Sequence, residues 1–304
     1  MRDSSEENGQ RSPELERLES VVAPSQSIIE LSSDVKSLWD ESPTRAAGCR
    51  QTLKIGDVEY GFCWIPAGEF DMGSPKSEQR EADANMYIDY FWDFSEEALH
   101  HVKLTKGFWL LETPMPQSLY EEVMGTNPSK FKGDNLPVEN VSWYDATEFC
   151  EELTKRLPKW LKATLPTEAQ WEYGCRAGTT TPYSFGNALN GDDANCAGDY
   201  PFGTKTKGKY VGQTTPVKSY RPNPWGLYDM HGNVDEWTSD YYDDYPSGTA
   251  IDPKGPTFGS DRRVFRGGHW YNPALYCRSA RRGGVSADYR GHGNQGFRFL
   301  LVCD

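Results

Sequence analysis

The second half of this chain has almost no helical periodicity, and this feature constrains the fold more than any other. From Gly178 to the C-terminus, about 125 residues are rich in glycine, aromatic residues, asparagine and aspartate. The whole chain of 304 residues contains 10 Trp, 17 Tyr, 29 Gly and 20 Pro. Long segments of this kind are uncommon in compact domains unless they carry function. We therefore expect a turn-rich fold of loops and short strands rather than a helical bundle.

Regular elements are expected mainly before that region. Apolar residues alternate with others over residues 58–64, which predicts a strand. Helices are predicted to begin at Pro116, Ser142 and Thr167, because proline suits the first helical turn and Ser or Thr can cap it. Thr167 together with Gln170 matches a capping box.

Composition also divides the chain. Residues 1–48 are rich in Ser, Glu and Pro and poor in aromatic residues, which predicts a flexible N-terminal tail. Short helices that form on a partner are the alternative for this segment. Residues 52–304 are predicted to form one packed domain. Within this domain, residues 267–298 are expected to form a C-terminal variable region, for reasons given below.

Charge and hydropathy exclude two classes of partner. The net charge is −13 and the pI is about 4.9, whereas nucleic-acid binders carry basic surfaces. We expect no nucleic-acid partner. The chain has no run of 18 apolar residues, so no membrane span is predicted. The charged start MRDSSEENGQ does not resemble a secretory signal. A cytoplasmic location fits the sequence as given, and the cell surface is the alternative if a leader was removed.

The cysteines do not form a metal-binding pattern. The seven residues are widely spaced, and no CxxC pair or HExxH motif is present. Free thiols in a reducing compartment are expected. Walker, GxGxxG and GxSxG motifs are also absent from the sequence.

Several strings, in order along residues 52–304, resemble one family. They are WIPAGEF and MGS within 64–74, PV and VSW within 137–143, LPTEAQWEY at 165–173, GLYDMHGNV at 226–234, EW at 236–237, RGG at 266–268, CRSA at 277–280 and GFR at 296–298. The chain resembles the formylglycine-generating enzyme, or sulfatase-modifying-factor, domain family. The resemblance implies an α+β, C-type-lectin-like fold with little regular secondary structure.

The family's enzyme oxidises a substrate cysteine with copper held by two thiolates five residues apart. Soft sulfur ligands suit Cu(I). Cys277 matches the second thiolate of this pair, but Asn272 occupies the position of the first. We therefore expect no copper, no catalytic residues and no formylglycine-generating activity. Cys277 is instead interpreted as a small buried residue.

The resemblance also implies a possible calcium site in the turn at 229–236. Asp229 and Glu236 would supply carboxylate oxygens, and the backbone near Gly232 and Val234 would supply carbonyl oxygens, which are the ligands that calcium prefers. A hydrogen-bonded turn without metal is the alternative. A second family site needs a carboxylate near position 209, where this chain has Lys209, so we expect that site to be lost.

Three functions are compatible with the resemblance: a formylglycine-generating oxidase, a regulatory domain with a fixed ligand, and a variable protein of a diversity-generating retroelement, similar to a Treponema variable protein. Adenine-directed mutagenesis of Asn codons cannot produce Lys, Glu, Gln, Met or Trp. These types make up about 20% of the chain, so about six are expected within 267–298, but only Trp270 and Gln295 occur there. We therefore predict a non-catalytic variable protein that binds a protein or peptide ligand.

The variable region is expected to separate ligand contacts from scaffold. Ten residues are predicted to cluster on one exposed surface and bind the ligand: His269, Tyr271, Asn272, Leu275, Tyr276, Arg282, Val285, Asp288, His292 and Asn294. Their neighbours are predicted to form a buried frame: Gly267, Gly268, Trp270, Cys277, Arg278, Ala280, Arg290, Gly296, Phe297 and Arg298. Residues 262–304 also contain eight Arg, no Lys and two Asp, which predicts a basic face. The alternative is that most of these arginines are scaffold residues that hydrogen-bond loop carbonyls, namely Arg278, Arg281, Arg290 and Arg298, and that Arg282 is free.

Overall fold

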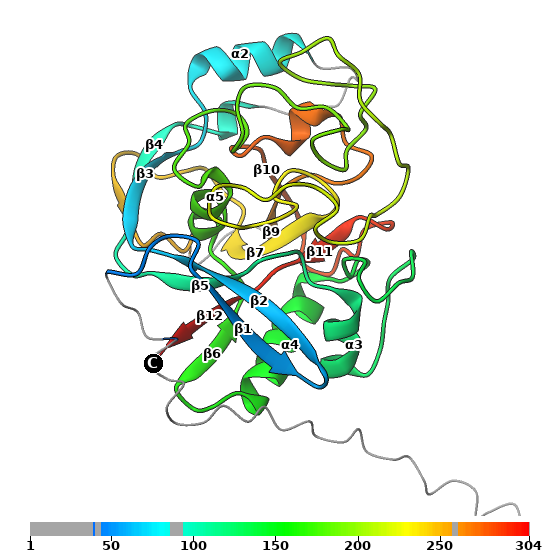
Figure 1. Cartoon of the computed structure of the whole chain (residues 1–304). Coiled ribbons are helices and arrows are strands. Elements are labelled where there is room, and N and C mark those ends of the chain that lie inside the picture. The colour runs from blue at the N-terminus through cyan, green and yellow to red at the C-terminus, as the bar shows by residue number, and fades with distance from the viewer. Residues whose placement is uncertain (1–38, 40–43, 86–93, 257–260, 304) are drawn as a thin grey trace, which may run out of the picture.

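The computed structural model describes Trp39 and residues 44–85, 94–256 and 261–303 (Figure 1). Within these residues, short helices and strands alternate with long loops, so the fold is α+β and loop-rich, as predicted. Residues 177–234 contain no helix and no named strand. None of the described helices is long and apolar enough to cross a membrane.

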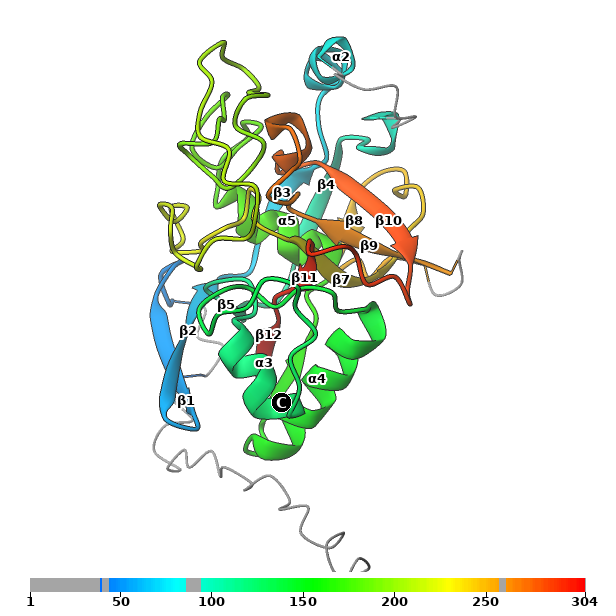
Figure 2. The same cartoon turned by 90° about the vertical axis from the view of Figure 1, so that its right-hand side faces the viewer.

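The largest sheet joins both ends of the domain. Its antiparallel order is β1 (Arg50–Ile55), β2 (Val58–Ile65), β5 (Phe108–Leu111), β12 (Leu300–Cys303) and β6 (Leu161–Thr164). The C-terminal strand therefore lies between β5 and β6, which precede it in the sequence by well over 100 residues. Helices α3 (Gln117–Met124) and α4 (Trp143–Arg156) lie side by side against this part of the fold (Figures 1 and 2).

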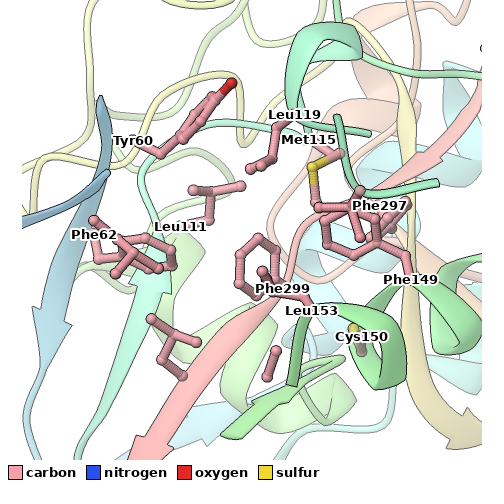
Figure 3. Close-up of a cluster of buried hydrophobic side chains, with 14 of the residues drawn as sticks. Tyr60, Phe62, Leu111, Met115, Leu119, Phe149, Cys150, Leu153, Phe297 and Phe299 are labelled. Atoms are coloured by element: carbon pink, nitrogen blue, oxygen red, sulfur yellow. The ribbon is translucent and has the colours of Figure 1, made fainter. Parts of the chain in front are cut away.

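The main hydrophobic core lies between that sheet and these two helices. Its side chains come from β2, β5, α3, α4 and the segment before β12, and ten of them are labelled in Figure 3. The rings of Phe149, Phe297 and Phe299 pack at centroid distances of 5.5 to 5.7 Å, in edge and tilted arrangements. Such aromatic pairs add to the stabilisation from apolar burial.

Two smaller sheets complete the domain. One has the order β10 (Arg282–Ser286), β9 (Arg262–Arg266), β7 (Asp235–Tyr241) and β11 (Gln295–Phe297), with β11 parallel to β7. The other joins β3 (Gly68–Met72), β4 (His100–Leu104) and β8 (Ala250–Ile251). Helix α5 (Glu168–Arg176) contacts β3, β7 and β9 and so connects these two sheets. The remaining elements are α2 (Lys76–Ala84), η3 (Phe94–Glu96) and η4 (Ala274–Cys277).

The helix starts expected from the sequence are confirmed. Ser142 caps α4 and Thr167 caps α5, and each belongs to a complete capping box, with Asp145 and Gln170 respectively. Helix α3 follows Pro116 and ends at a glycine in the left-handed conformation. The strand predicted over 58–64 is β2.

The packed domain begins before residue 48, which the sequence did not predict. The Trp39 side chain is 1% exposed, and its carbonyl oxygen accepts a 2.9 Å hydrogen bond from Trp109 Nε1. The Arg45 guanidinium lies 4.7 Å from the centroid of the Trp109 ring. The prediction of an unpacked segment through residue 48 was therefore wrong at Trp39, because its indole completes the aromatic core beside β5. Residues 1–38 of the predicted tail lie outside the described residues.

Candidate ligand-binding site

A cavity of about 470 Å³ lies beside the variable region. Its wall is formed by residues 267–269 and 271–273, by Tyr276 of η4 and by parts of β9 and β10, and its floor by the first residues of β7 and β11. Seven of the ten predicted ligand-binding residues line it: His269, Tyr271, Asn272, Tyr276, Arg282, Val285 and Asn294. The fold thus brings most of the predicted residues to one concave surface, although only Tyr271 among these seven is classed as exposed.

Three predicted residues do not line the cavity. Leu275 is 1% exposed and packs in a hydrophobic cluster with Tyr183 and Phe202, because η4 turns its side chain inward. Asp288 and His292 are exposed, and Asp288 accepts a hydrogen bond from the Ser286 hydroxyl. The prediction that all ten would share one exposed surface was therefore wrong for Leu275, and Asp288 and His292 lie outside the cavity lining.

Arg282 was predicted to be free, and this was wrong. Its side chain is 2% exposed, and its Nε and Nη2 atoms each donate a 2.8 Å hydrogen bond to Glu168. Its Nη1 donates to the carbonyl oxygen of Asp243 at 2.8 Å. Arg282 lines one side of the cavity, but its contacts make it a structural residue.

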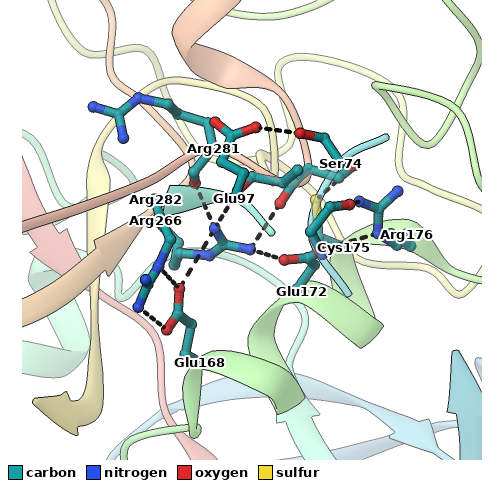
Figure 4. Close-up of polar contacts among 12 residues, drawn as sticks. Ser74, Glu97, Glu168, Glu172, Cys175, Arg176, Arg266, Arg281 and Arg282 are labelled. Atoms are coloured by element: carbon teal, nitrogen blue, oxygen red, sulfur yellow. Dashed lines mark hydrogen bonds and ion pairs between the residues drawn. The ribbon is translucent and has the colours of Figure 1, made fainter. Parts of the chain in front are cut away.

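A layer of buried ion pairs explains the arginine content of the C-terminal region. Glu168 and Glu172 are four residues apart on α5, so both face β9 and β10, where they bind Arg282 and Arg266 (Figure 4). Arg278 likewise binds Glu97 and Glu78, at 2.9 and 2.6 Å. The predicted basic face is therefore largely internal and neutralised by glutamates from distant segments.

The predicted frame is mostly buried. Gly267, Gly268, Cys277, Arg278, Ala280, Gly296, Phe297 and Arg298 are buried, as expected. Trp270 is half-buried, and its indole N–H donates to the Gly293 carbonyl at 2.7 Å. Arg290 is exposed and pairs with Asp145, so its assignment to the buried frame was wrong.

Asn272 holds the loop that borders the cavity. Its side-chain oxygen accepts a 3.0 Å hydrogen bond from the His269 N–H, and its own N–H donates to the His269 carbonyl at 2.9 Å. The Asn272 carbonyl accepts a further bond from Ala197 N–H at 2.8 Å. The residue at the position of the family's first thiolate thus stabilises a turn.

Cys277 lies behind the cavity wall. Its thiol is fully buried, and burial raises its pKa well above the ordinary value, which disfavours the thiolate that a metal would need. Gly268 packs so closely against it that a Cβ atom there would lie 2.7 Å from the Cys277 sulfur. Two sulfur ligands for copper are therefore not available at positions 272 and 277.

The polar groups at the cavity floor have shifted pKa values or lack hydrogen-bond partners. Burial raises the pKa of Asp235 to about 8, although the nearby Arg281 opposes this shift. The His269 Nε2 atom lies 3.6 Å from the Asp235 carboxylate, and burial lowers the pKa of His269 to about 3. The side-chain nitrogens His269 Nδ1 and Gln295 Nε2 are buried without a hydrogen-bond partner in the described structure. Asp235 and Gln295 were not among the sequence-predicted ligand residues.

The predicted calcium turn does not fit a calcium ion in this conformation. Both oxygens of Glu236 accept hydrogen bonds from Arg298, at 2.6 and 2.7 Å, and one also accepts from Trp171. Asp229 accepts a hydrogen bond from the Lys218 N–H, and burial raises its pKa to about 6. The Gly232 carbonyl accepts from the Val234 N–H at 3.0 Å. Because Arg298 already neutralises the Glu236 carboxylate, this carboxylate has no uncompensated negative charge with which to bind a calcium ion.

The fold and cavity together define a C-type-lectin-like α+β domain with a concave site near its C-terminus. The family model for the sulfatase-modifying factor enzyme 1-like domain matches residues 57–302. The chain therefore belongs to this family, which agrees with the resemblance of its sequence motifs.

Curated relatives include active and inactive members. The chain is 35% identical over 185 residues to the mouse formylglycine-generating enzyme, covering 59% of this chain and 46% of that protein. It is 31% identical over 205 residues to the mouse inactive C-alpha-formylglycine-generating enzyme 2, covering 66% and 58%. The matched region thus spans about half the length of these relatives.

Two solved structures share the fold over most of the chain. Treponema denticola variable protein 1 has a TM-score of 0.65 and 27% identity, and the match covers 84% of this chain and 99% of that one. PvdO from Pseudomonas aeruginosa has a TM-score of 0.67 and 25% identity, with coverage of 85% and 99%.

Proposed function

We propose that this chain is a non-catalytic ligand-binding protein whose cavity, lined by residues of the 267–298 region, binds a protein or peptide ligand. The observation that carries the proposal is the gathering of seven predicted residues around one cavity of about 470 Å³. Pockets of roughly 300–1,000 Å³ are typical of ligand sites. A cavity of this size accommodates one or two side chains of a peptide.

The composition of the rim supports recognition of a protein or peptide. Tyr271 is 42% exposed at the cavity, and Val285 and Tyr289 are half-exposed there. Tyrosines supply large contact areas at low cost in conformational entropy, and small residues around them adapt to different ligands. The similarity to Treponema denticola variable protein 1 supports a variable protein of a diversity-generating retroelement.

The ion-pair layer limits where such variation is tolerated. We expect sequences of this locus from different isolates to vary at Tyr271 and Val285, which line the cavity and are exposed and half-exposed. Arg282 and Leu275 should stay constant, because their burial supports the fold. Variation spread evenly over buried and exposed positions would contradict the proposal of a variable protein, and an invariant 267–298 region would favour a regulatory domain with a fixed ligand.

The alternative function is a formylglycine-generating oxidase, which the 35% identity to the mouse enzyme supports. Asn272 and the buried thiol of Cys277 argue against it. A cysteine-containing sulfatase peptide incubated with the protein and copper should gain no aldehyde by mass spectrometry. Formation of the aldehyde above the level of a Cys277→Ala control would establish the oxidase instead.

Binding itself is tested by selecting peptides from a displayed random library on the wild-type protein. Tyr271→Ala should reduce the affinity for the selected peptides at least tenfold, because it removes the most exposed aromatic side chain of the cavity rim. Tyr210→Ala is the matched control, since Tyr210 is 49% exposed and does not line the cavity. Equal losses in both variants, or none in Tyr271→Ala, would refute the assignment of the ligand to this cavity.

A further inference from the structure

Asp235 differs from the buried glutamates of the ion-pair layer and its neighbourhood. Glu168, Glu172 and Glu236 each bind an arginine. Among the described residues, no Lys or Arg side chain lies within ion-pairing distance of Asp235, whose side chain is 7% exposed; its one such neighbour is His269. A buried carboxyl group without a cationic partner is costly to ionise.

Strand pairing places Asp235 on the cavity floor. It is the first residue of β7, and its partner across the parallel pair is Gln295, the first residue of β11. Side chains two residues apart on a strand share a face, so Asp235 and Gln295 continue the face that Trp237 and Phe297 present to the main core. The core stops short of these first residues, and the cavity lies beyond it.

Other cavity groups point to a missing ligand at this position. His269 and Gln295 both line the cavity and are 5% and 1% exposed, and among the described residues His269 Nδ1 and Gln295 Nε2 have no hydrogen-bond partner. In one tautomer His269 Nδ1 accepts a hydrogen bond from a bound cation, whereas Gln295 Nε2 is a donor that needs an acceptor elsewhere on the ligand. The lining also includes aromatic rings: the Tyr271 ring centroid lies 3.9 Å from that of His269 in a tilted arrangement, and Tyr289 is a further lining residue. Aromatic faces attract cations, and most strongly where water is excluded.

We propose that the cavity floor binds a basic group, an ammonium or a guanidinium, with Asp235 as its counter-ion and the tyrosines as its walls. This inference rests on the proposed ligand-binding function and names the chemical class that the cavity selects. The basic group comes either from a lysine or arginine side chain of a peptide or from a small free amine. Its charge compensates the buried carboxylate, as arginines do for the neighbouring glutamates.

The groups around Asp235 set the pH dependence of this binding. His269, Arg281, Glu236, Cys277 and Tyr289 face it or interact with it electrostatically. Burial, the largest contribution, and Glu236 both disfavour the carboxylate, and together they outweigh Arg281 and the Gly268 backbone N–H, so that the pKa of Asp235 is about 8. Asp235 must lose its proton to pair with a cation. Affinity for a basic ligand should therefore rise about tenfold per pH unit below pH 8 and level off above it.

Titration calorimetry of the whole chain with four probes tests the proposal. Benzylamine and Nα-acetyl-lysine amide should bind, and benzyl alcohol and benzoate should bind at least tenfold more weakly at pH 8. The lysine derivative and benzylamine distinguish a peptide side chain from a free amine as the preferred source. Stronger binding of benzoate would overturn the proposal and would indicate an anion site at Arg281.

Variants separate the role of charge from that of folding. Asp235→Asn should lower the affinity for benzylamine at least tenfold at pH 8 and abolish its rise with pH, while Asp57→Asn, at a fully exposed turn, should change neither. Unchanged benzylamine binding in Asp235→Asn would overturn the proposal. Should this variant unfold, the wild-type pH profile decides, because affinity that is flat between pH 6 and 8 refutes the role of Asp235.

Failure of this inference is distinguishable from failure of the proposed function. If wild-type protein binds selected peptides through Tyr271 but shows no preference for basic probes, the cavity binds a ligand of another class. If Tyr271→Ala leaves peptide binding intact, the ligand site lies elsewhere and both proposals fail.

Discussion

Replacing Arg282 with alanine removes one half of a buried ion pair. In the wild-type protein this side chain makes two 2.8 Å hydrogen bonds to Glu168 and one to the Asp243 carbonyl, and its guanidinium carbon lies 4.0 Å from the Tyr245 ring centroid. The variant would leave the Glu168 carboxylate buried with only Tyr245 and a more distant Arg266 as partners.

The expected loss is large because the remaining charge cannot reach water. Breaking a buried pair by removing one partner costs about 3–5 kcal/mol. We expect the lower end, about 3 kcal/mol, since Arg266 Nη1 stays 3.7 Å from Glu168. Urea unfolding at pH 7, followed by tryptophan fluorescence, measures the difference in the free energy of unfolding.

The exposed pair of Arg290 and Asp145 provides the control. The Arg290 side chain is 55% exposed, so Arg290→Ala should cost no more than about 1 kcal/mol. Burial alone would raise the pKa of Glu168, but Arg282 and Arg266 outweigh burial, and the pKa of Glu168 is lowered. The ion pair of Arg282 and Glu168 therefore stabilises the fold fully at pH values above the ordinary pKa of a carboxyl group. The effect of Arg282→Ala should shrink in acid, as pH falls through the folded pKa of Glu168. Equal effects of the two variants at pH 7 would refute the assignment of Arg282 to the structural layer.

Four further results are expected. Replacing a fully buried tryptophan with alanine costs about 3–5 kcal/mol. Trp270→Ala should cost less, because Trp270 is half-buried, and urea unfolding measures the difference. The melting temperature should fall as the pH rises from 4 to 8, because burial raises the pKa values of Asp235 and Asp240 to about 8 and about 7, so that their ionisation is less favourable in the folded state than in the unfolded state. The Asp235→Asn variant should show a smaller fall. EGTA should leave the melting temperature unchanged, and a drop of several degrees would restore the calcium hypothesis. Added Cu(I) should not bind in a Cys277-dependent manner by absorption spectroscopy, and a thiolate–copper band lost in Cys277→Ala would contradict the structural role of that residue.

The sequence by itself determined the features that depend on neighbouring residues. The capping boxes at Ser142 and Thr167 identified the starts of α4 and α5, because cap and partner are three residues apart. The lack of periodicity after Gly178 indicated loops, and the ordered motifs indicated the family. Asn272 in place of a cysteine argued against copper without any need for coordinates.

Only the tertiary structure decided which polar groups are satisfied. Arg282 meets Glu168 across 114 residues of sequence, so the sequence did not reveal its partner and Arg282 was expected to be free. Arg278 was expected to be buried, but Glu78, one of the glutamates that bind it, is 200 residues away and was not predicted. Asp235 and Gln295 come together through parallel pairing of β7 with β11. Pairing across the fold is set by packing rather than by local sequence, and it determines both the unpaired carboxyl group on the cavity floor and the neutralised arginines behind it.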